Sequence, residues 1–217
     1  MITMTDMLGW LAQPYSIAYG GYSVVLARGL APEEVVARIA AEALPGHTVR
    51  PLGPYTGEDL IDDHDLDFAG DFEAIALRHG QADGLSYAVA YGYWQGELHL
   101  PESVSRGDGV EVHHLEYEEE NGKPVPPFYR ASRDGQPLCG FNLHLDGSWG
   151  FAGVDGEPAV AAAVTADLAA LGLPDPERAN REVHRLCLEV LGRRFGLTLP
   201  RGPVLEGELP AVLLETA

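Results

Sequence analysis

The chain has 217 residues, with 33 acidic and 14 basic side chains and a formal net charge of −19. A surface this negative repels nucleic-acid phosphates and anionic lipids, which excludes nucleic acids and membrane surfaces as partners and favours basic protein faces. No apolar run approaches the roughly 20 residues of a membrane-spanning helix, and the N-terminus lacks the positive region and apolar core of a signal peptide. We therefore expect a cytoplasmic protein.

The composition favours one folded domain. Hydrophobic residues make up 46 % of the chain, an ordinary value for a globular protein, and a chain of this length can bury a full core. The C-terminal residues are mostly Pro, Gly, Leu and Glu. We expect a single domain over residues 1–200 and an extended tail over residues 201–217.

The first half of the chain contains one predicted helix and three predicted strands. Apolar and β-branched residues over 22–29 predict a strand, and Pro32 stands at the favoured first position of a helix. Residues 46–71 are rich in Gly, Pro and Asp and are predicted to be irregular. Residues 72–78 and 85–93 predict two further strands, the second with a clear period of two.

The second half contains a strong hairpin signal. Asp134-Gly135 separates two alternating segments and predicts a tight turn, so that 110–118, 127–133 and 137–145 form consecutive antiparallel strands. The apolar phase changes at His113-His114, which suggests either a β-bulge or burial of both faces.

Two helices close the pattern. Pro158 opens the first, and an apolar stripe ending before Gly196 marks the second. These elements predict an α+β fold, with a mainly antiparallel sheet of five to six strands and helices packed on one face.

The order of these elements resembles that of a family of uncharacterised proteins common in Streptomyces and other actinobacteria. The resemblance covers roughly residues 10–200 and is carried by five short motifs: Arg28-Gly-Leu-Ala-Pro-Glu-Glu-Val35, Tyr93-Trp94-Gln-Gly96, Ser105-Arg-Gly107, Asp134-Gly135 and Gly196-Leu-Thr-Leu199. It implies one domain and a bacterial cytoplasm. It implies no catalytic residues.

A dense acidic segment over residues 58–73 contains eight carboxylates and no Lys or Arg. Two interpretations are a solvated loop and a contact surface for a basic partner. In the second interpretation the partner-binding residues are Asp62, Asp63, Asp65 and Asp67.

The same segment imitates the start of a calcium-binding loop. Such a loop needs Gly at its sixth position and Glu at its twelfth, where this chain has Phe68 and Ala74. His184 and Cys187 share a helix face as zinc ligands do, but the sequence supplies no further ligand pattern. We expect no specific metal site and no cofactor.

Polar residues of two predicted strands form the weak candidate set for catalysis, namely His113, His114, Asn142 and His144. A histidine with a polar neighbour is the minimum for general acid–base chemistry. The alternative is that these are ordinary polar positions of a sheet. Aromatic residues near Tyr87 and Tyr91 belong to a core or line a groove for a small apolar ligand.

Two functions therefore stay open. The first is a non-enzymatic acidic protein that neutralises or regulates a basic protein partner, as an immunity protein or an antitoxin does. The second is a small tailoring enzyme with an aromatic pocket and a sheet histidine as general acid and base. The charge and the absence of a catalytic motif favour the first.

Overall fold

The protein is described by a computed structural model, which covers residues 7–17, 21–43, 46–66, 74–92, 101–118, 126–148 and 153–216. Within these residues, nine strands form one antiparallel sheet: β1 (Gly21–Arg28), β2 (His47–Tyr55), β3 (Ala74–Ala82), β4 (Leu85–Gly92), β5 (Glu111–Glu118), β6 (Phe128–Arg133), β7 (Gln136–Asn142), β8 (Asp155–Gly156) and β9 (Leu209–Thr216). The helices are α1 (Pro32–Arg38), α2 (Gly57–Asp63), α3 (Pro158–Ala170), α4 (Asn180–Phe195) and α5 (Arg201–Leu205), with a 3-10 helix at Leu8–Ala12 and a π-helical turn at Ile39–Ala43.

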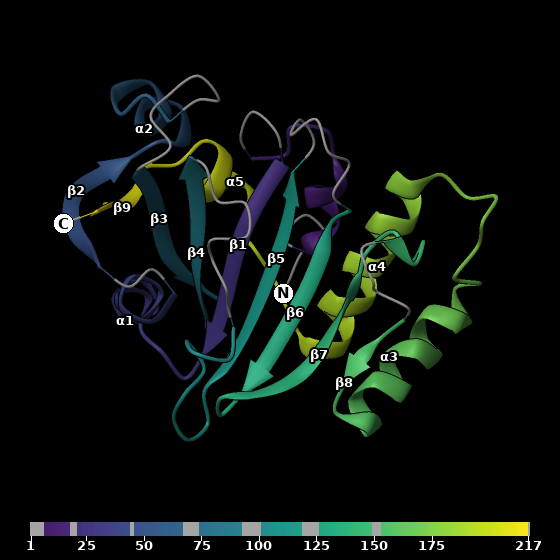
Figure 1. Ribbon diagram of the computed structural model, residues 1–217. Coiled ribbons are helices and arrows are strands. Elements are labelled where there is room, and N and C mark those ends of the chain that lie inside the picture. Colours follow the sequence, from purple (N-terminus) through teal and green to yellow (C-terminus); the bar gives the residue numbers. More distant parts are fainter. Residues whose placement is uncertain are drawn as a thin grey trace.

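The strand order in the sheet is β2-β9-β3-β4-β1-β5-β6-β7-β8. The first strand along the chain, β1, lies in the middle, and the last, β9, lies between β2 and β3 (Figure 1). The predicted α+β class with an antiparallel sheet is confirmed, whereas the predicted number of five to six strands is wrong.

Helices cover both faces of the sheet, so the prediction that they pack on one face is wrong. Val24 and Leu26 of β1 belong to the larger core, which α4 covers, whereas Val25 and Ala27 belong to a second core beneath α1. Apolar residues at consecutive positions are typical of a strand that is buried on both sides. None of the helices in the described ranges is long and apolar enough to cross a membrane.

The predicted hairpin is confirmed. The strands β5, β6 and β7 pair consecutively and antiparallel. Asp134 and Gly135 join β6 to β7 with φ of 53° and 76°, and positive φ at both central residues is the turn geometry that Asp-Gly favours. The β-bulge suggested at His113-His114 is wrong, because β5 pairs with β1 and β6 there without a register shift. The apolar phase changes because both faces of β5 are buried.

Two elements lie where irregular chain was expected. The strand β2 contains Pro51 and Pro54, and among the described strands it pairs only with β9. An edge strand tolerates proline because one side of it makes no ladder hydrogen bonds. The helix α2 follows Thr56, whose side-chain oxygen accepts a hydrogen bond from the backbone N–H of Asp59 at 3.1 Å. The sequence did not predict β2 and α2 because the Pro and Gly residues of this segment favour irregular chain.

The C-terminal residues 201–217 were expected to form an extended tail. Residues 201–205 form α5, and residues 209–216 form β9, which pairs with both β2 and β3. Ala211 to Leu214 are buried, so this strand contributes directly to the core.

The last long helix, α4, packs its apolar stripe on the sheet. Val183, Leu186 and Val190 are buried, and the helix ends at Gly196 in the left-handed region, with φ of 60°. We expect Leu186→Ala to lower the free energy of unfolding by about 2–3 kcal/mol, because it removes packed methyl groups and leaves a cavity. Urea unfolding would measure this loss. Arg181→Ala, an exposed change on the same helix, is the control, and equal midpoints for the two variants would show that α4 is peripheral.

Candidate functional site

The first part of the acidic segment lies in a short amphipathic helix, α2. In α2, Leu60 and Ile61 are buried in the larger core, and Leu66 after the helix is buried with them. This packing turns the polar side of the helix to solvent. The exposed carboxylates are Glu58, Asp59, Asp62, Asp63 and Asp65, and together they are called the acidic face below.

The carboxylates of the acidic face have no cation partner within the described part of the chain. The one side-chain hydrogen bond among them joins Thr56 Oγ1 to Asp59 Oδ2 at 2.7 Å. Asp65 has φ of 49°, a left-handed conformation that Asp adopts more readily than most residues. Asp67, which was also predicted to bind a partner, lies outside the described residues.

Some carboxylates elsewhere in the described residues are paired with arginine, and others, such as Glu102 and Asp108, are exposed there without an ion pair. Glu111, Asp167 and Glu215 each bond a guanidinium, and Arg50 Nη2 lies 2.9 Å from Glu215 Oε1. The chain has a single lysine, Lys123, and it lies outside the described residues. What distinguishes the acidic face is that five exposed carboxylates follow one another closely on and after a single short helix.

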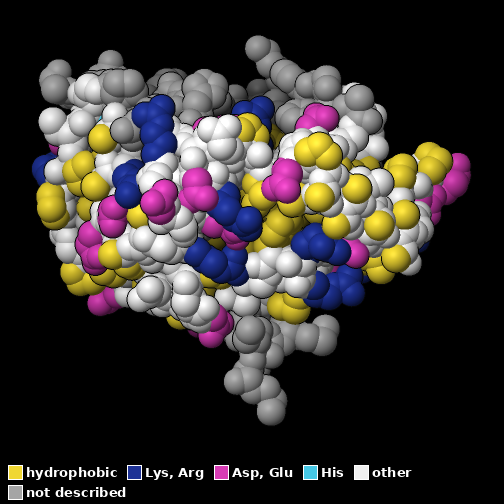
Figure 2. Space-filling model, turned by 90° about the horizontal axis from the view of Figure 1, so that it is seen from below, with side chains coloured by type: hydrophobic (Ala, Val, Ile, Leu, Met, Phe, Trp, Pro, Cys, Tyr) yellow, Lys and Arg dark blue, Asp and Glu magenta, His cyan; other side chains and the backbone are white. Residues whose placement is uncertain are grey.

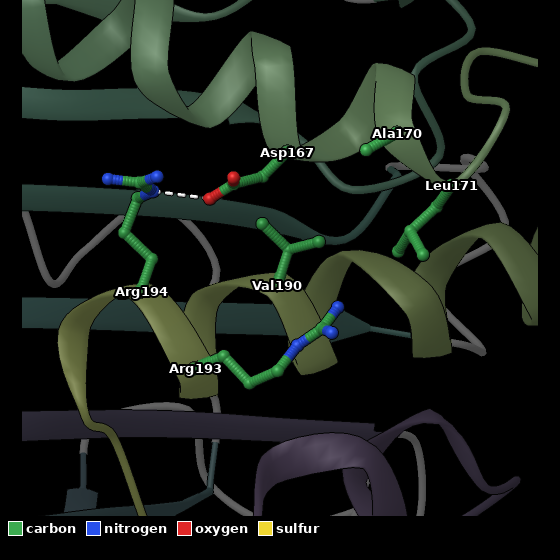
Figure 3. Close-up of a pocket in the computed structure, with 6 residues that line it drawn as sticks. All are labelled: Asp167, Ala170, Leu171, Val190, Arg193 and Arg194. Carbon is green, nitrogen blue, oxygen red and sulfur yellow. Dashed lines mark hydrogen bonds and ion pairs between the residues drawn. The ribbon is translucent and has the colours of Figure 1, made fainter.

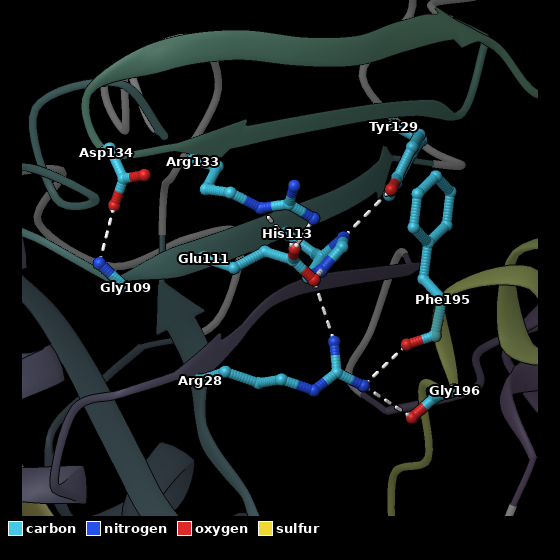
Figure 4. A network of polar contacts seen from close by, with 9 residues as sticks. All are labelled: Arg28, Gly109, Glu111, His113, Tyr129, Arg133, Asp134, Phe195 and Gly196. Atoms are coloured by element: carbon cyan, nitrogen blue, oxygen red, sulfur yellow. Dashed lines mark hydrogen bonds and ion pairs between the residues drawn. The ribbon is translucent and has the colours of Figure 1, made fainter. Parts of the chain in front are cut away.

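His113 is part of a buried polar network (Figure 4). Its Nε2 lies 2.8 Å from Glu111 Oε1, and its Nδ1 lies 2.8 Å from the hydroxyl of Tyr129. The hydrogen bond from His113 lowers the pKa of Glu111 to about 2, while burial lowers the pKa of His113 and raises that of Tyr129 well above its ordinary value. Since a carboxylate only accepts, neutral His113 donates from Nε2 and accepts the Tyr129 hydroxyl proton at Nδ1.

Two arginines complete this network and tie it to α4. Arg28 Nη1 and Arg133 Nη2 donate to the Glu111 carboxylate at 2.7 and 2.5 Å. Arg28 Nη2 also donates to the backbone oxygens of Phe195 and Gly196, so the guanidinium caps the carbonyl end of α4. Each polar side chain of this network is hydrogen-bonded to another group of the protein, so the network links the sheet to the end of α4. His113 is buried within it and is not accessible to a substrate.

His114 lies on the opposite face of β5, since successive strand residues alternate. Its Nε2 lies 3.2 Å from Ser23 Oγ. Glu116 Oε2 lies 3.6 Å from the same nitrogen, which is too far for a hydrogen bond, so this carboxylate does not offset the effect of burial on the His114 pKa. Burial lowers the pKa of His114 to about 3, so the ring is neutral.

Asn142 and His144 occupy a different part of the structure from His113. Asn142 holds the turn after β7, because its Nδ2 donates to Asp146 Oδ1 at 2.6 Å and its Oδ1 accepts from the backbone N–H of His144 at 2.7 Å. The His144 ring packs at 6.0 Å from that of His184. His113 packs against Phe195, eleven positions further along α4, or roughly 16 Å along the helix axis. The four predicted catalytic residues are therefore not brought together.

The sequence interpretation missed one histidine contact. His184 Nε2 lies 2.7 Å from the hydroxyl of Tyr22, and its ring also packs against those of Tyr117 and His144. Burial lowers the pKa of His184 to about 3. No local signal connects residues 22 and 184, which meet only when α4 packs on β1.

The cysteines are both free and buried, and burial raises the pKa of Cys139 and of Cys187 to about 12, so neither is a reactive thiolate. Among the residues described, no three His, Cys, Asp or Glu side chains lie close enough together to hold a metal ion.

The chain gives no match when it is compared with protein-family models, with curated proteins or with solved structures. The resemblance to uncharacterised actinobacterial proteins thus stays a prediction from the sequence motifs.

Proposed function

We propose that the protein is a non-enzymatic acidic binding protein of the cytoplasm that neutralises or regulates a basic protein partner, as an immunity protein or an antitoxin does. The acidic face of α2 is the contact surface in this proposal. The same charge repels nucleic acids and anionic lipids, so the partner is a protein with a basic surface.

The observation that carries the proposal is the unpaired charge of the acidic face. Five carboxylates lie exposed on and just after a helix of seven residues, with no ion pair in the described part of the chain. Like charges at neighbouring helix positions destabilise the helix. Basic side chains of a partner would relieve this repulsion and convert it into attraction.

The geometry gives less support to the alternative of an enzyme with a sheet histidine. His113, His114 and His184 are 0, 1 and 2 % exposed. A general acid or base must come within hydrogen-bond reach of its substrate, whereas each of these buried rings already bonds a side chain inside the protein through its Nε2.

Charge changes on the acidic face should weaken binding of the partner. The variant combines three changes, Asp62→Lys, Asp63→Lys and Asp65→Asn, the last chosen because Asn tolerates the left-handed backbone. The control has the same change in net charge at other exposed positions, Glu102→Lys, Asp108→Lys and Glu177→Gln. Three exposed ion pairs of about 0.5 kcal/mol each predict roughly tenfold weaker binding.

The measurement is affinity capture from a lysate of the source organism at low and at high salt, followed by identification of the retained proteins. We expect the wild type and the control to retain the same basic protein at low salt, and the acidic-face variant to lose it. Circular dichroism verifies that all three proteins are folded. Equal retention by the two variants would contradict the proposal.

A further inference from the structure

The C-terminal end of α4 is fixed to the sheet by charged side chains. The carbonyl oxygens of Phe195 and Gly196 accept hydrogen bonds from Arg28 Nη2. Arg28 Nη1 in turn lies 2.7 Å from Glu111 Oε1. Hydrogen bonds, that of His113 first, lower the pKa of Glu111 to about 2, so this carboxylate stays ionised in mild acid and keeps Arg28 in place. Figure 2 views the molecule from below and shows Lys and Arg side chains beside Asp and Glu side chains near the middle of that face.

The neighbouring helix α3 also holds the second half of α4 (Figure 3). The Arg194 guanidinium reaches across to Asp167 of α3. This hydrogen bond lowers the pKa of Asp167 below its ordinary value, so the ion pair also persists in mild acid. Val190 is buried and points toward α3. The second half of α4 is thus fixed on two sides, by β1 and by α3.

The first half of α4 is held by uncharged rings instead. His184 Nε2 lies 2.7 Å from the hydroxyl of Tyr22, which comes from β1. The ring centres of Tyr117, from β5, and of His144, from the turn after β7, lie 5.4 and 6.0 Å from that of His184. Burial, followed by the effect of His144, lowers the pKa of His184 to about 3. This half of the helix therefore contacts the sheet through a neutral imidazole.

The surroundings of His184 supply no anion that would stabilise a protonated ring. In the described residues, burial and His144 are the two causes of its pKa shift, and no carboxylate contributes. Asp146 acts on His144 and raises its pKa, although burial lowers that pKa overall. The 3-10 helix Leu8–Ala12, which packs along α4, has no ionisable side chain. The other ionisable residues on this half of α4 are Arg181, Glu182, Arg185 and Cys187.

We propose that the first half of α4, residues 180–188, is an acid-released segment, in which a proton on His184 frees this half from the sheet while the second half stays fixed. A protonated ring between two tyrosines and a second histidine is a buried charge without a partner, which is unfavourable. A proton on His144 adds repulsion, since the two ring centres are 6.0 Å apart. Release lets water reach both imidazoles.

The size of the response follows from proton uptake by His184. Its pKa is about 6.5 in the released form, where water surrounds the ring, and about 3 in the packed form. The population of the released form is therefore lowest above pH 6.5 and rises about tenfold per pH unit below it, or about 30-fold at pH 5. Val183 and Leu186 leave the core on release, so the packed form predominates at neutral pH.

The two cysteines of the chain provide the test, because both are free and buried. Cys187 lies on the first half of α4 and Cys139 lies on β7, so release exposes Cys187 alone and complete unfolding exposes both. The full-length protein is mixed with 4,4′-dithiodipyridine, a disulfide that reacts with thiols in mild acid, and mass spectrometry assigns the labelled cysteine. Each rate is divided by the rate for the urea-unfolded protein at the same pH, which removes the pH dependence of the thiol itself.

We expect Cys187 to react faster than Cys139 at every pH, and its corrected rate to rise about 30-fold between pH 7.5 and pH 5. Equal rates for the two cysteines would show that only complete unfolding exposes Cys187. A Cys187 rate that does not rise in acid would show that His184 does not control the release. Either result would overturn the proposal.

Two histidine variants separate local release from complete unfolding, after circular dichroism has verified that each is folded. His184→Gln keeps an acceptor for the Tyr22 hydroxyl and should abolish the rise of the Cys187 rate in acid. His114 has the same pKa of about 3 because of burial, but it lies on the sheet face that α4 does not cover. His114→Gln should therefore leave the rise unchanged, and a smaller rise in this variant would contradict local release.

A third variant tests the same contact without removing the titrating ring. Tyr22→Phe removes the hydrogen bond to His184, which contributes about 1 kcal/mol, and should raise the Cys187 rate at pH 7.5 about fivefold. The relative rise in acid should persist, because His184 still titrates. A Cys187 rate equal to that of the wild type would show that the Tyr22–His184 contact does not hold the helix, and the proposal would fail.

Discussion

Replacement of Arg78 by methionine is expected to lower the free energy of unfolding by about 3–5 kcal/mol, because several carbonyl oxygens lose their donor at about 1–3 kcal/mol for each that stays buried. Arg78 lies on β3 and is fully buried. Its Nε donates to the Tyr55 carbonyl oxygen at 3.0 Å, and its Nη1 donates to the Tyr91 hydroxyl at 2.7 Å and to the Val204 carbonyl oxygen at 2.9 Å. Its Nη2 donates to the backbone oxygen of Gly207.

The loss is large because no other donor can replace the guanidinium. Methionine has similar volume but no donor for the four carbonyl oxygens of Tyr55, Pro203, Val204 and Gly207, and each of these groups that stays buried costs about 1–3 kcal/mol. These carbonyls belong to the ends of β2 and α5, so Arg78 also holds the segment that leads into β9. Unfolding in guanidinium chloride measures the effect.

Arg50→Met is the matched control for Arg78→Met. Arg50 is exposed and pairs with Glu215 on the sheet edge, where water competes for both charges. Its replacement should barely move the unfolding midpoint. If Arg78→Met and Arg50→Met had the same unfolding midpoint, the hydrogen bonds of the buried guanidinium would contribute nothing to the free energy of unfolding.

Acid should destabilise the protein well before its carboxylates protonate. His114 and His184 have a pKa of about 3 in the folded state because of burial, against about 6.5 in the unfolded chain. The unfolded state therefore takes up protons first, so stability is full above pH 6.5 and falls as the pH drops toward 3. At pH 5 the loss is about 2 kcal/mol per histidine, or about 4 kcal/mol for the pair.

A second loss of stability follows at lower pH. Glu111 has a folded pKa of about 2, below its ordinary value of 4.5, because His113 and Arg133 bond its carboxylate. Its contribution is present above pH 4.5 and disappears as the pH falls toward 2. Protonation of the histidines and protonation of Glu111 both lower the free energy of unfolding as the pH falls. The protein should therefore show no stability maximum in mild acid.

Urea unfolding at pH 7.5, 6.5, 5.5 and 5.0 measures the histidine effect. His184→Gln keeps an acceptor for the Tyr22 hydroxyl and removes the titrating ring. The slope of the free energy of unfolding against pH below 6.5 should therefore fall by about 1.4 kcal/mol per pH unit. Arg181→Gln changes an exposed side chain of the same helix and should leave this slope unchanged. A wild-type stability that is constant from pH 7.5 to 5 would contradict the buried, neutral histidines.

The sequence predicts those parts of the fold whose signals are local. The Asp134-Gly135 turn and the alternation on both sides of it suffice for β6 and β7, because the two strands pair with each other. The strands β2 and β9 were not predicted. Their partners are far apart in the chain, and Pro51 and Pro54 conceal an edge strand that needs no hydrogen bonds on its outer side.

Less of the candidate site than of the fold could be predicted from the sequence. Exposure of Asp62 and Asp63 follows from the acidic composition and agrees with the structure. The separation of His113 from His114 could have been predicted, since neighbouring strand residues point to opposite faces. The distance between His113 and His144 could not, because it depends on where α4 crosses the sheet.

The association rate tests most directly whether the acidic face attracts a basic partner. Stopped-flow mixing with the captured partner should show a rate that falls steeply with added salt, because screening weakens long-range attraction. The acidic-face variant with Asp62→Lys, Asp63→Lys and Asp65→Asn should associate about tenfold more slowly at low salt, with a smaller change in dissociation. An association rate that depends neither on salt nor on these charges would contradict the claim.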